Sequence, residues 1–268
     1  MPYRVLKTLL LGLPLLVTGG CKEHIVEQLA FLPEKASDYP PTNLVDTQEV
    51  WLNAEDGVAI HSFYLAQYDS EQVILFFHGN AGNAYSRLPH AEILRNMGFN
   101  VLVVDYHGYG KSQGTPSEKG LYLDAKAAYQ YAQNELGFAP DKIYLYGRSI
   151  GSTAVIDLAS QHKVAGSILV APLSSGRAMA KQMGLGWLDW LVDGVFDNLD
   201  KAKTIQSPIL ILHGSQDRVV PIDQGKDLFD AVASADKQFI IINDGGHNNI
   251  SDSKHVDFWL TIEKFLAQ

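Results

Sequence analysis

The chain has 268 residues, of which 46% are hydrophobic and 19% charged, with a formal net charge of -9 at pH 7. This composition is typical of a folded globular protein and excludes an intrinsically disordered chain. The acidic balance gives no reason to expect a nucleic acid partner, which requires a clustered basic face. The length suits one α/β domain with a large core.

The first 21 residues follow the order of a targeting signal. Arg4 and Lys7 form a short positive region, residues 8–17 are apolar and uncharged, and glycines precede Cys21, the only cysteine. The apolar run is shorter than the roughly 20 residues that cross a bilayer, but it suits the core of a signal peptide. A lone cysteine excludes an internal disulfide.

This segment resembles a bacterial lipoprotein signal, in which the cysteine is lipidated and becomes the first residue of the mature chain. Thr18 stands where such signals usually have leucine. An ordinary secretory signal and an uncleaved N-terminal anchor are the alternatives. We predict a signal peptide over residues 1–20, a lipid anchor on Cys21 and a place in the bacterial cell envelope. Lys22 follows the cysteine, and by the same resemblance it favours the periplasmic face of the outer membrane.

An α/β domain is predicted over residues 48–268, after an N-terminal arm (22–47) in which prolines interrupt regular structure. Asp56-Gly57 indicates a β-hairpin. Short apolar runs after the hairpin suit strands that are buried on both faces of a parallel sheet. The predicted strands are 50–53, 58–66, 73–77, 101–105, 143–146, 167–170, 209–212 and 238–242.

Helical patterns alternate with these strands, at 84–97, 118–136, 152–161, 222–233 and 252–266. A hairpin followed by repeated strand–helix units predicts a mostly parallel, doubly wound sheet with an antiparallel start. Ligands of such sheets bind beyond the carboxyl ends of the strands. Candidate functional residues should therefore come directly after strands.

The sequence Gly147-Arg148-Ser149-Ile150-Gly151 lies between a predicted strand and a predicted helix. This is the GxSxG nucleophile elbow in the strand–turn–helix context that it requires. The tight turn needs glycine two residues before and two residues after the serine, and it holds the serine in a strained conformation that projects its Oγ. The alternative is an ordinary strand-to-helix turn capped by Ser149. We predict that Ser149 is a catalytic nucleophile.

A serine nucleophile needs a base, and the base needs an acid that orients it. His247 follows the last predicted strand in Gly245-Gly246-His247-Asn248, whereas His255 falls in the final predicted helix and is expected to be solvated. Asp217 follows the strand 209–212, and its rival Asp223 falls in a first helical turn, where acids are common. The order serine, aspartate, histidine is that of α/β-hydrolases.

Two backbone N–H groups should stabilise the negative charge of the intermediate. We assign one to Ile150, directly after the nucleophile, and the other to Asn80 in the loop after strand 73–77. His78 precedes the glycine of that loop and is expected to brace it, and His213 has the same place in its own loop.

The nine histidines are scattered without the spacing of a metal site, and no GxGxxG follows a first strand. We therefore expect neither a metal nor another cofactor.

Four segments together resemble the membrane-associated α/β-hydrolase-domain family, over about residue 28 to the C-terminus. They are His78 to Asn83, Asp105 to Ser112, Gly147 to Gly151 and Gly245 to Asn248. The family includes protein depalmitoylases and lysophospholipid or monoacylglycerol lipases, so the resemblance implies an α/β-hydrolase fold and hydrolysis of an acyl ester or thioester. His107 stands where the family usually has an arginine that is thought to be structural.

The strand–helix alternation breaks between residues 173 and 207, in a segment rich in methionine and aromatic residues. The resemblance and the position imply a short lid. We predict that Trp187, Trp190 and Phe196 contact an apolar acyl group, the alternative being that they only cover the core. The predicted activity is hydrolysis of a carboxylic ester or thioester through an acyl-enzyme. The alternatives are an amidase or aminopeptidase and a catalytically silent envelope lipoprotein of the same fold.

Overall fold

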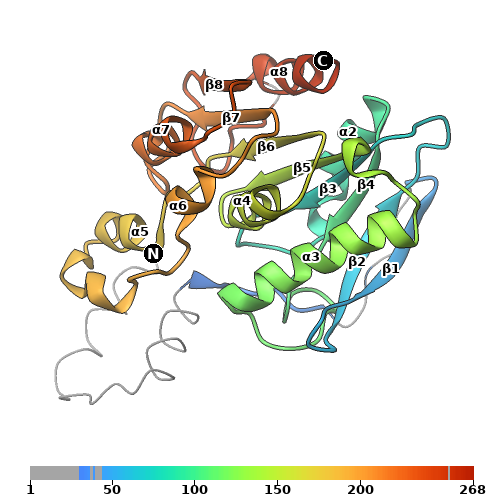
Figure 1. Cartoon of the computed structure of the whole chain (residues 1–268), viewed down its shortest axis with the longest axis horizontal. Helices are drawn as coiled ribbons and strands as arrows, with labels where there is room; N and C mark the ends of the chain where they lie inside the picture. Colours follow the sequence, from blue (N-terminus) through green and yellow to red (C-terminus); the bar gives the residue numbers. More distant parts are fainter. Residues whose placement is uncertain (1–29, 37–38, 40–43, 253) are drawn as a thin grey trace.

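The computed structural model describes residues 30–36, 39, 44–252 and 254–268 (Figure 1). The predicted signal peptide, Cys21 and part of the predicted arm lie outside the described residues.

A single sheet of eight strands forms the centre of the described structure, in the order β1-β2-β4-β3-β5-β6-β7-β8. β1 pairs antiparallel with β2, and β2 pairs antiparallel with β4. All other neighbours are parallel. The predicted fold, an α/β-hydrolase sheet with an antiparallel start, is confirmed. The strands are β1 (Thr47–Asn53), β2 (Ala59–Leu65), β3 (Val73–Phe77), β4 (Asn100–Val104), β5 (Ile143–Arg148), β6 (Gly166–Val170), β7 (Ile209–Gly214) and β8 (Lys237–Ile242).

Helices cover both faces of this sheet (Figure 1), so β3, β4 and β6 are buried at every position and are mostly apolar. One face packs against α3 (Glu118–Asn134), α4 (Gly151–Gln161), α6 (Asn198–Ala202) and α7 (Ile222–Ala231). The other face packs against α2 (Leu88–Asn96) and α8 (Val256–Leu266). Two 3-10 turns, η2 (Tyr85–Arg87) and η3 (Pro140–Lys142), precede α2 and β5. The alternation of side chains along each strand sends successive residues into two separate cores.

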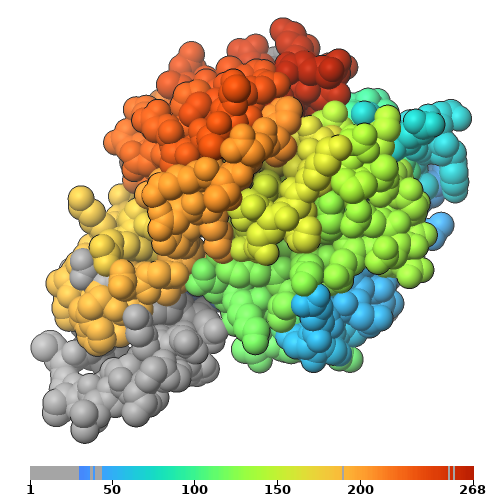
Figure 2. Space-filling view, in the orientation of Figure 1, coloured from blue at the N-terminus to red at the C-terminus, as the bar shows by residue number. Residues whose placement is uncertain are grey.

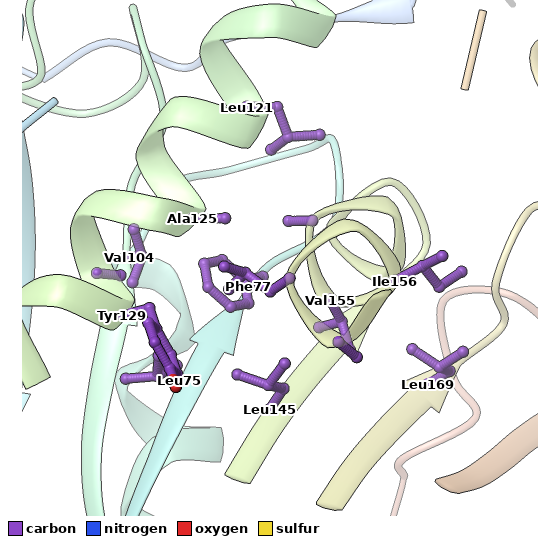
Figure 3. Close-up of a cluster of buried hydrophobic side chains, with 14 of the residues drawn as sticks. Leu75, Phe77, Val104, Leu121, Ala125, Tyr129, Leu145, Val155, Ile156 and Leu169 are labelled. Carbon is purple, nitrogen blue, oxygen red and sulfur yellow. The ribbon is translucent and has the colours of Figure 1, made fainter. Parts of the chain in front are cut away.

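The larger core lies between the sheet and helices α3 and α4 (Figure 3). Ser117 caps α3 by accepting a hydrogen bond from the N–H of Gly120 at 2.8 Å. Leu121, Ala125 and Tyr129 then recur every four residues and turn one stripe of the helix towards Phe77 at the end of β3. This packing fixes the strand ends after which the candidate residues lie.

Two predicted helices begin later than their patterns suggest. The segment 84–97 starts with the 3-10 turn η2, and the last helix starts at Val256 and not at Asp252. The expectation for His255 was wrong: this residue is only 8% exposed and precedes α8 as its cap. Helical periodicity alone does not distinguish a solvated position from one that is covered by a neighbouring loop.

His107 is packed between two carboxylates. Its Nδ1 lies 2.6 Å from Asp124 on α3, and its Nε2 lies 3.1 Å from Asp56 in the turn between β1 and β2. Burial lowers the pKa of His107, but the hydrogen bond and negative charge of Asp124 outweigh burial and raise it. The imidazole therefore links the hairpin to α3 at a position where an arginine was expected.

The segment between β6 and β7 forms α5 (Gly176–Gln182), the 3-10 segment η4 (Gly186–Leu191) and α6. Figure 2 shows α5 and η4 as a lobe that projects from one side of the molecule. The helices among the described residues are all too short or too polar to cross a bilayer.

Candidate active site

Ser149 lies in the sharp turn between β5 and α4, with a backbone φ of 53°. Residues other than glycine rarely adopt this left-handed backbone conformation. Such a conformation persists only where the surrounding structure enforces it. The N–H of Ser149 donates to the carbonyl of Val170 at 2.8 Å, which ties the turn to the end of β6. The predicted nucleophile elbow is therefore formed.

The two glycines of the motif are required by close packing. A Cβ at Gly147 would lie 2.6 Å from the carbonyl oxygen of Gly151 and 2.7 Å from a methyl group of Val155. A Cβ at Gly151 would overlap the carbonyl oxygens of Phe77 and His78. The first turn of α4 therefore lies directly against the loop that follows β3.

The structure brings Ser149, His247 and Asp217 together in one hydrogen-bonded chain. Nε2 of His247 lies 3.1 Å from the Oγ of Ser149, and its Nδ1 lies 2.7 Å from a carboxylate oxygen of Asp217. The three residues come from the ends of three different parallel strands, at one edge of the sheet. In this arrangement the imidazole can take the hydroxyl proton while the carboxylate stabilises the resulting imidazolium.

The carboxylate of Asp217 is held in its ionised form. Its side chain is fully buried, and the N–H groups of Val219 and Val220 each donate to Oδ1 at 2.9 Å. Burial acts to raise the pKa of Asp217, but the hydrogen bonds from His247 and from these two N–H groups outweigh burial and lower it. Asp217 is thus an anion that faces His247.

The rival acid lies in a different environment. Asp223 is in the first turn of α7, where its exposed side chain pairs with Lys226 at 3.0 Å. His213 is buried, and its Nε2 lies 2.9 Å from the carbonyl of Val220. Burial is the main cause that lowers the pKa of His213, so its neutral ring braces the loop that carries Asp217.

The loop after β3 approaches the nucleophile closely. A Cβ at Gly79 would be in van der Waals contact with the Cβ of Ser149, at 3.6 Å. The side chain of Asn80 faces the arm, because its Oδ1 accepts hydrogen bonds from the N–H of Leu32 at 2.7 Å and from the hydroxyl of Tyr109 at 2.6 Å. Its amide also donates to the carbonyl of Ala30.

Within the described part of the chain, no acceptor is found for the backbone N–H of Asn80 or of Ile150. Both residues flank the Ser149 turn, one in the loop after β3 and the other at the start of α4. A pair of N–H groups without an acceptor is what the binding of an oxyanion requires, so the assignment of Asn80 and Ile150 stays a prediction.

Two residues without a predicted role hold this site together. The carboxylate of Asp105 faces Nε2 of His78 at 3.3 Å and accepts the N–H of Ala84 at 2.7 Å, so it fastens both ends of the loop after β3. Arg148 donates to the carbonyl of His247 at 2.7 Å. The position of Asp105 directly after a strand was a usable signal, but nothing in the sequence links Arg148 to His247.

The three predicted substrate-contacting residues lie in two environments. Trp187 and Trp190 on η4 are 67% and 55% exposed. Phe196 is only 4% exposed and packs edge-to-face against Phe31, with ring centroids 6.0 Å apart. The structure therefore places Phe196 in the core and does not support a substrate-binding role for it. A pattern of apolar residues cannot separate these two cases.

Among the residues that the structure describes, no three histidine, cysteine, aspartate or glutamate side chains are grouped so that they could hold a metal ion.

The family model described as "Serine aminopeptidase, S33" (Hydrolase_4) matches residues 68–199 and 177–254. The chain belongs to the α/β-hydrolase family. It is 32% identical to alpha/beta hydrolase domain-containing protein 17C of Mus musculus over 238 residues, which cover 87% of this chain and 70% of the relative. The human protein of the same name is also 32% identical, with 68% of its length covered.

Solved structures share the fold. An esterase of Pyrococcus furiosus superposes with a TM-score of 0.74 at 20% identity, over 88% of this chain and 95% of the esterase. An alpha-beta hydrolase of Vibrio vulnificus gives a TM-score of 0.68 at 25% identity, over 82% of this chain and 81% of that one. A monoacylglycerol lipase of Paleococcus ferrophilus gives 0.63 at 21% identity, over 77% of this chain and 98% of the lipase.

The packing of the elbow predicts the effect of Gly151→Ala. The added methyl group would overlap two backbone carbonyl oxygens, which cannot rotate away. We expect a loss of about 1–3 kcal/mol in the free energy of unfolding, measured by urea denaturation. Gly186→Ala is the matched control, because its new Cβ would meet nothing closer than 3.6 Å. Equal stability of the two variants would contradict the close packing of this turn.

Proposed function

We propose that this protein is a serine hydrolase that cleaves a carboxylic ester or thioester through an acyl-enzyme on Ser149. The observation that carries the proposal is the continuous hydrogen-bonded chain from Ser149 through His247 to Asp217. The strained backbone of Ser149 adds support, since strain of this kind is maintained at functional sites.

In the proposed mechanism, Nε2 of His247 takes the hydroxyl proton as the Oγ of Ser149 attacks the acyl carbon. The negative charge that forms on the acyl oxygen is stabilised by the N–H groups of Ile150 and Asn80. His247 then gives its proton to the leaving alcohol or thiol, and the acyl group stays on Ser149. A water molecule, deprotonated by His247, releases the acid. Asp217 remains ionised and stabilises the imidazolium in both steps.

An amidase or aminopeptidase is a second candidate, favoured by the description of the matching family model. Ester hydrolysis is preferred because structures of the same fold include an esterase and a monoacylglycerol lipase. A catalytically silent envelope protein is the third alternative. The two enzymatic candidates differ in the bond that is cleaved, and the silent protein differs from both in lacking a reactive serine.

For the acyl group, we propose contact with the exposed rings of Trp187 and Trp190. The lid lies next to the acid loop, because Gln182 of α5 donates to the carbonyl of Arg218, the neighbour of Asp217. Large exposed apolar side chains near a reactive serine can cover an apolar chain.

We also propose that Cys21 carries a lipid anchor that holds the enzyme in a bacterial envelope, at the periplasmic face of the outer membrane. Support comes from the order of the N-terminal sequence, in which a basic region, an apolar run and small residues precede the cysteine.

Ser149→Ala should lower ester hydrolysis by at least about 10³-fold, because nucleophile, base and acid act as a unit. The measurement is kcat/KM on p-nitrophenyl butyrate. A fluorophosphonate probe should label the wild-type protein and not the variant. Ser160→Ala on α4 is the control, since its hydroxyl only bonds the carbonyl of Asp157. Most of the activity surviving in Ser149→Ala would refute the mechanism. Labelling without ester hydrolysis, combined with cleavage of peptide substrates, would favour the aminopeptidase.

The lid predicts a dependence on acyl chain length. Each methylene group that is buried contributes about 0.8 kcal/mol of binding free energy, which corresponds to a nearly fourfold gain in affinity. We expect kcat/KM to rise from acetyl to roughly butyryl–octanoyl esters and then to level off or fall. Trp187→Ala and Trp190→Ala should flatten the rise and leave acetyl hydrolysis nearly unchanged. If both variants lose kcat/KM by the same factor on acetyl and octanoyl esters, the tryptophans support the fold and do not contact the acyl chain.

Cys21→Ser should abolish lipidation and move the protein from the membrane to the soluble fraction. The change removes the thiol that would carry the lipid and leaves the apolar run intact. Fractionation of cells that express each form, with metabolic labelling by a tagged fatty acid, measures both effects. A variant that stays wholly in the membrane fraction would show that another feature anchors the chain.

A further inference from the structure

A small cavity lies behind the Ser149 turn, on the face of the sheet that packs against α2 and α8. Its apolar walls are side chains of β3, β5, β6 and α8, together with Ile250 in the loop before α8. The rest of its lining comes from η2, from α2 and from three segments of the proposed active site: His78, Gly79, Arg87, His90, Arg148 and Ser251. The space holds about one water-sized body, so a large ligand does not fit.

This cavity is rich in positive charge and hydrogen-bond donors and has no acid in its lining. Among the residues that the structure describes, neither Arg87 nor Arg148 forms an ion pair with a carboxylate. The Nε of Arg87 and the Nδ1 of His90 are buried and have no hydrogen-bond partner in the part of the chain that the structure describes. Ser251 faces the other ring nitrogen of His90 at 3.2 Å and can donate to it, which leaves Nδ1 to carry the proton.

Arg87 and Arg148 line the same cavity, so two like charges share one small space. The pKa of Arg87 is lowered, mainly by burial and then by the positive charge of Arg148. The pKa of His90 is lowered by burial and then by both arginines. Glu34 and Asp252 act on these groups from outside the cavity and do not line it. Buried donors without a partner cost free energy, and so do two positive charges in one small space. A small anion would accept hydrogen bonds from the donors and offset the repulsion between the charges.

We propose that this cavity is a binding site for a monovalent, monatomic anion, with chloride as the ligand. A monatomic halide takes up less room than any oxyanion, and the single charge of chloride complements two guanidinium groups and the N–H of a neutral imidazole. Larger oxyanions and carboxylates need more room than the cavity offers.

The site is connected to the residues around Ser149 through its own donors. Arg87 donates to the carbonyl of Ala81 in the loop after β3, at 2.5 Å, and Arg148 donates to the carbonyl of His247 at 2.7 Å. An anion between the guanidinium groups would fix both side chains and, through them, the two loops. This inference goes beyond the proposed hydrolase activity, because binding itself requires neither substrate nor a reactive Ser149.

The test compares thermal unfolding of the purified protein in sodium chloride, sodium bromide and sodium gluconate at equal ionic strength. Gluconate is too large for the cavity. At a halide concentration about tenfold above the dissociation constant, we expect a Tm roughly 3–6 °C higher in either halide than in gluconate. Crystals soaked in bromide should show an anomalous peak within hydrogen-bonding distance of Arg87 and Arg148.

Arg87→Met removes one cavity cation and should abolish the difference in Tm between halide and gluconate. Arg95→Met on α2, the helix that begins directly after Arg87, is the matched control, because Arg95 pairs with Glu92 at 2.6 Å and does not line the cavity. The control should keep the full difference, as should Ser149→Ala. Since each variant is compared with itself in two salts, a lower baseline Tm does not affect the result.

Equal Tm values in all three salts, together with no bromide peak in the cavity, would overturn the proposal. So would a difference that Arg87→Met and Arg95→Met reduce alike, because that is a general charge effect. If Arg87→Met does not fold, the bromide map of the wild-type protein decides. Ester hydrolysis that survives in Ser149→Ala would refute the proposed function and leave the anion site standing.

Discussion

The contact between the first turn of α4 and the loop after β3 is the constraint on which the proposed active site depends. Gly151 touches the carbonyl groups of Phe77 and His78, and no larger residue fits there. This approach forces the chain to reverse within a few residues, which leaves Ser149 with a positive φ. It also brings the loop that contains Asn80 against the turn that contains Ser149 and Ile150. One steric condition therefore positions both the proposed nucleophile and the loop that carries a proposed oxyanion donor.

Around that contact, buried polar networks hold the loops that carry the other residues. Asp105 fastens the loop after β3, His213 and two backbone N–H groups fasten the Asp217 loop, and Arg148 fastens the His247 loop. Each of these groups is buried or half-buried, so removing one partner would leave the other without a hydrogen bond. Hydrogen bonds from buried groups therefore hold these loops in place of regular secondary structure.

The cation-rich cavity lies on the other side of the same turn. The residue before the serine serves both regions, because Arg148 lines the cavity and holds the carbonyl of His247. The alternation of side chains along β5 explains why Arg148 faces the cavity. Successive side chains of a strand point to opposite faces of the sheet, so Gly147 can face the helix α4 while Arg148 faces the second core.

The sequence by itself determined the order of strands and helices, the strand-to-helix turn at Ser149 and the places of Asp217 and His247 after strands. These features follow from local rules: hydrophobic periodicity, glycines at a tight turn and the position of polar residues beyond strand ends. The family resemblance also proved informative, since the chain belongs to the α/β-hydrolase family.

Only the tertiary structure decided which residues meet across long stretches of chain. It brought His247 to Ser149 over 98 positions, linked Arg148 to His247, and placed His107 between Asp56 and Asp124. It also separated Phe196, which is buried against Phe31, from the exposed Trp187 and Trp190. The physical reason is that burial and pairing depend on what covers a residue, and the covering group here comes from another element. The hydrophobic periodicity of a segment does not indicate which other element will cover it.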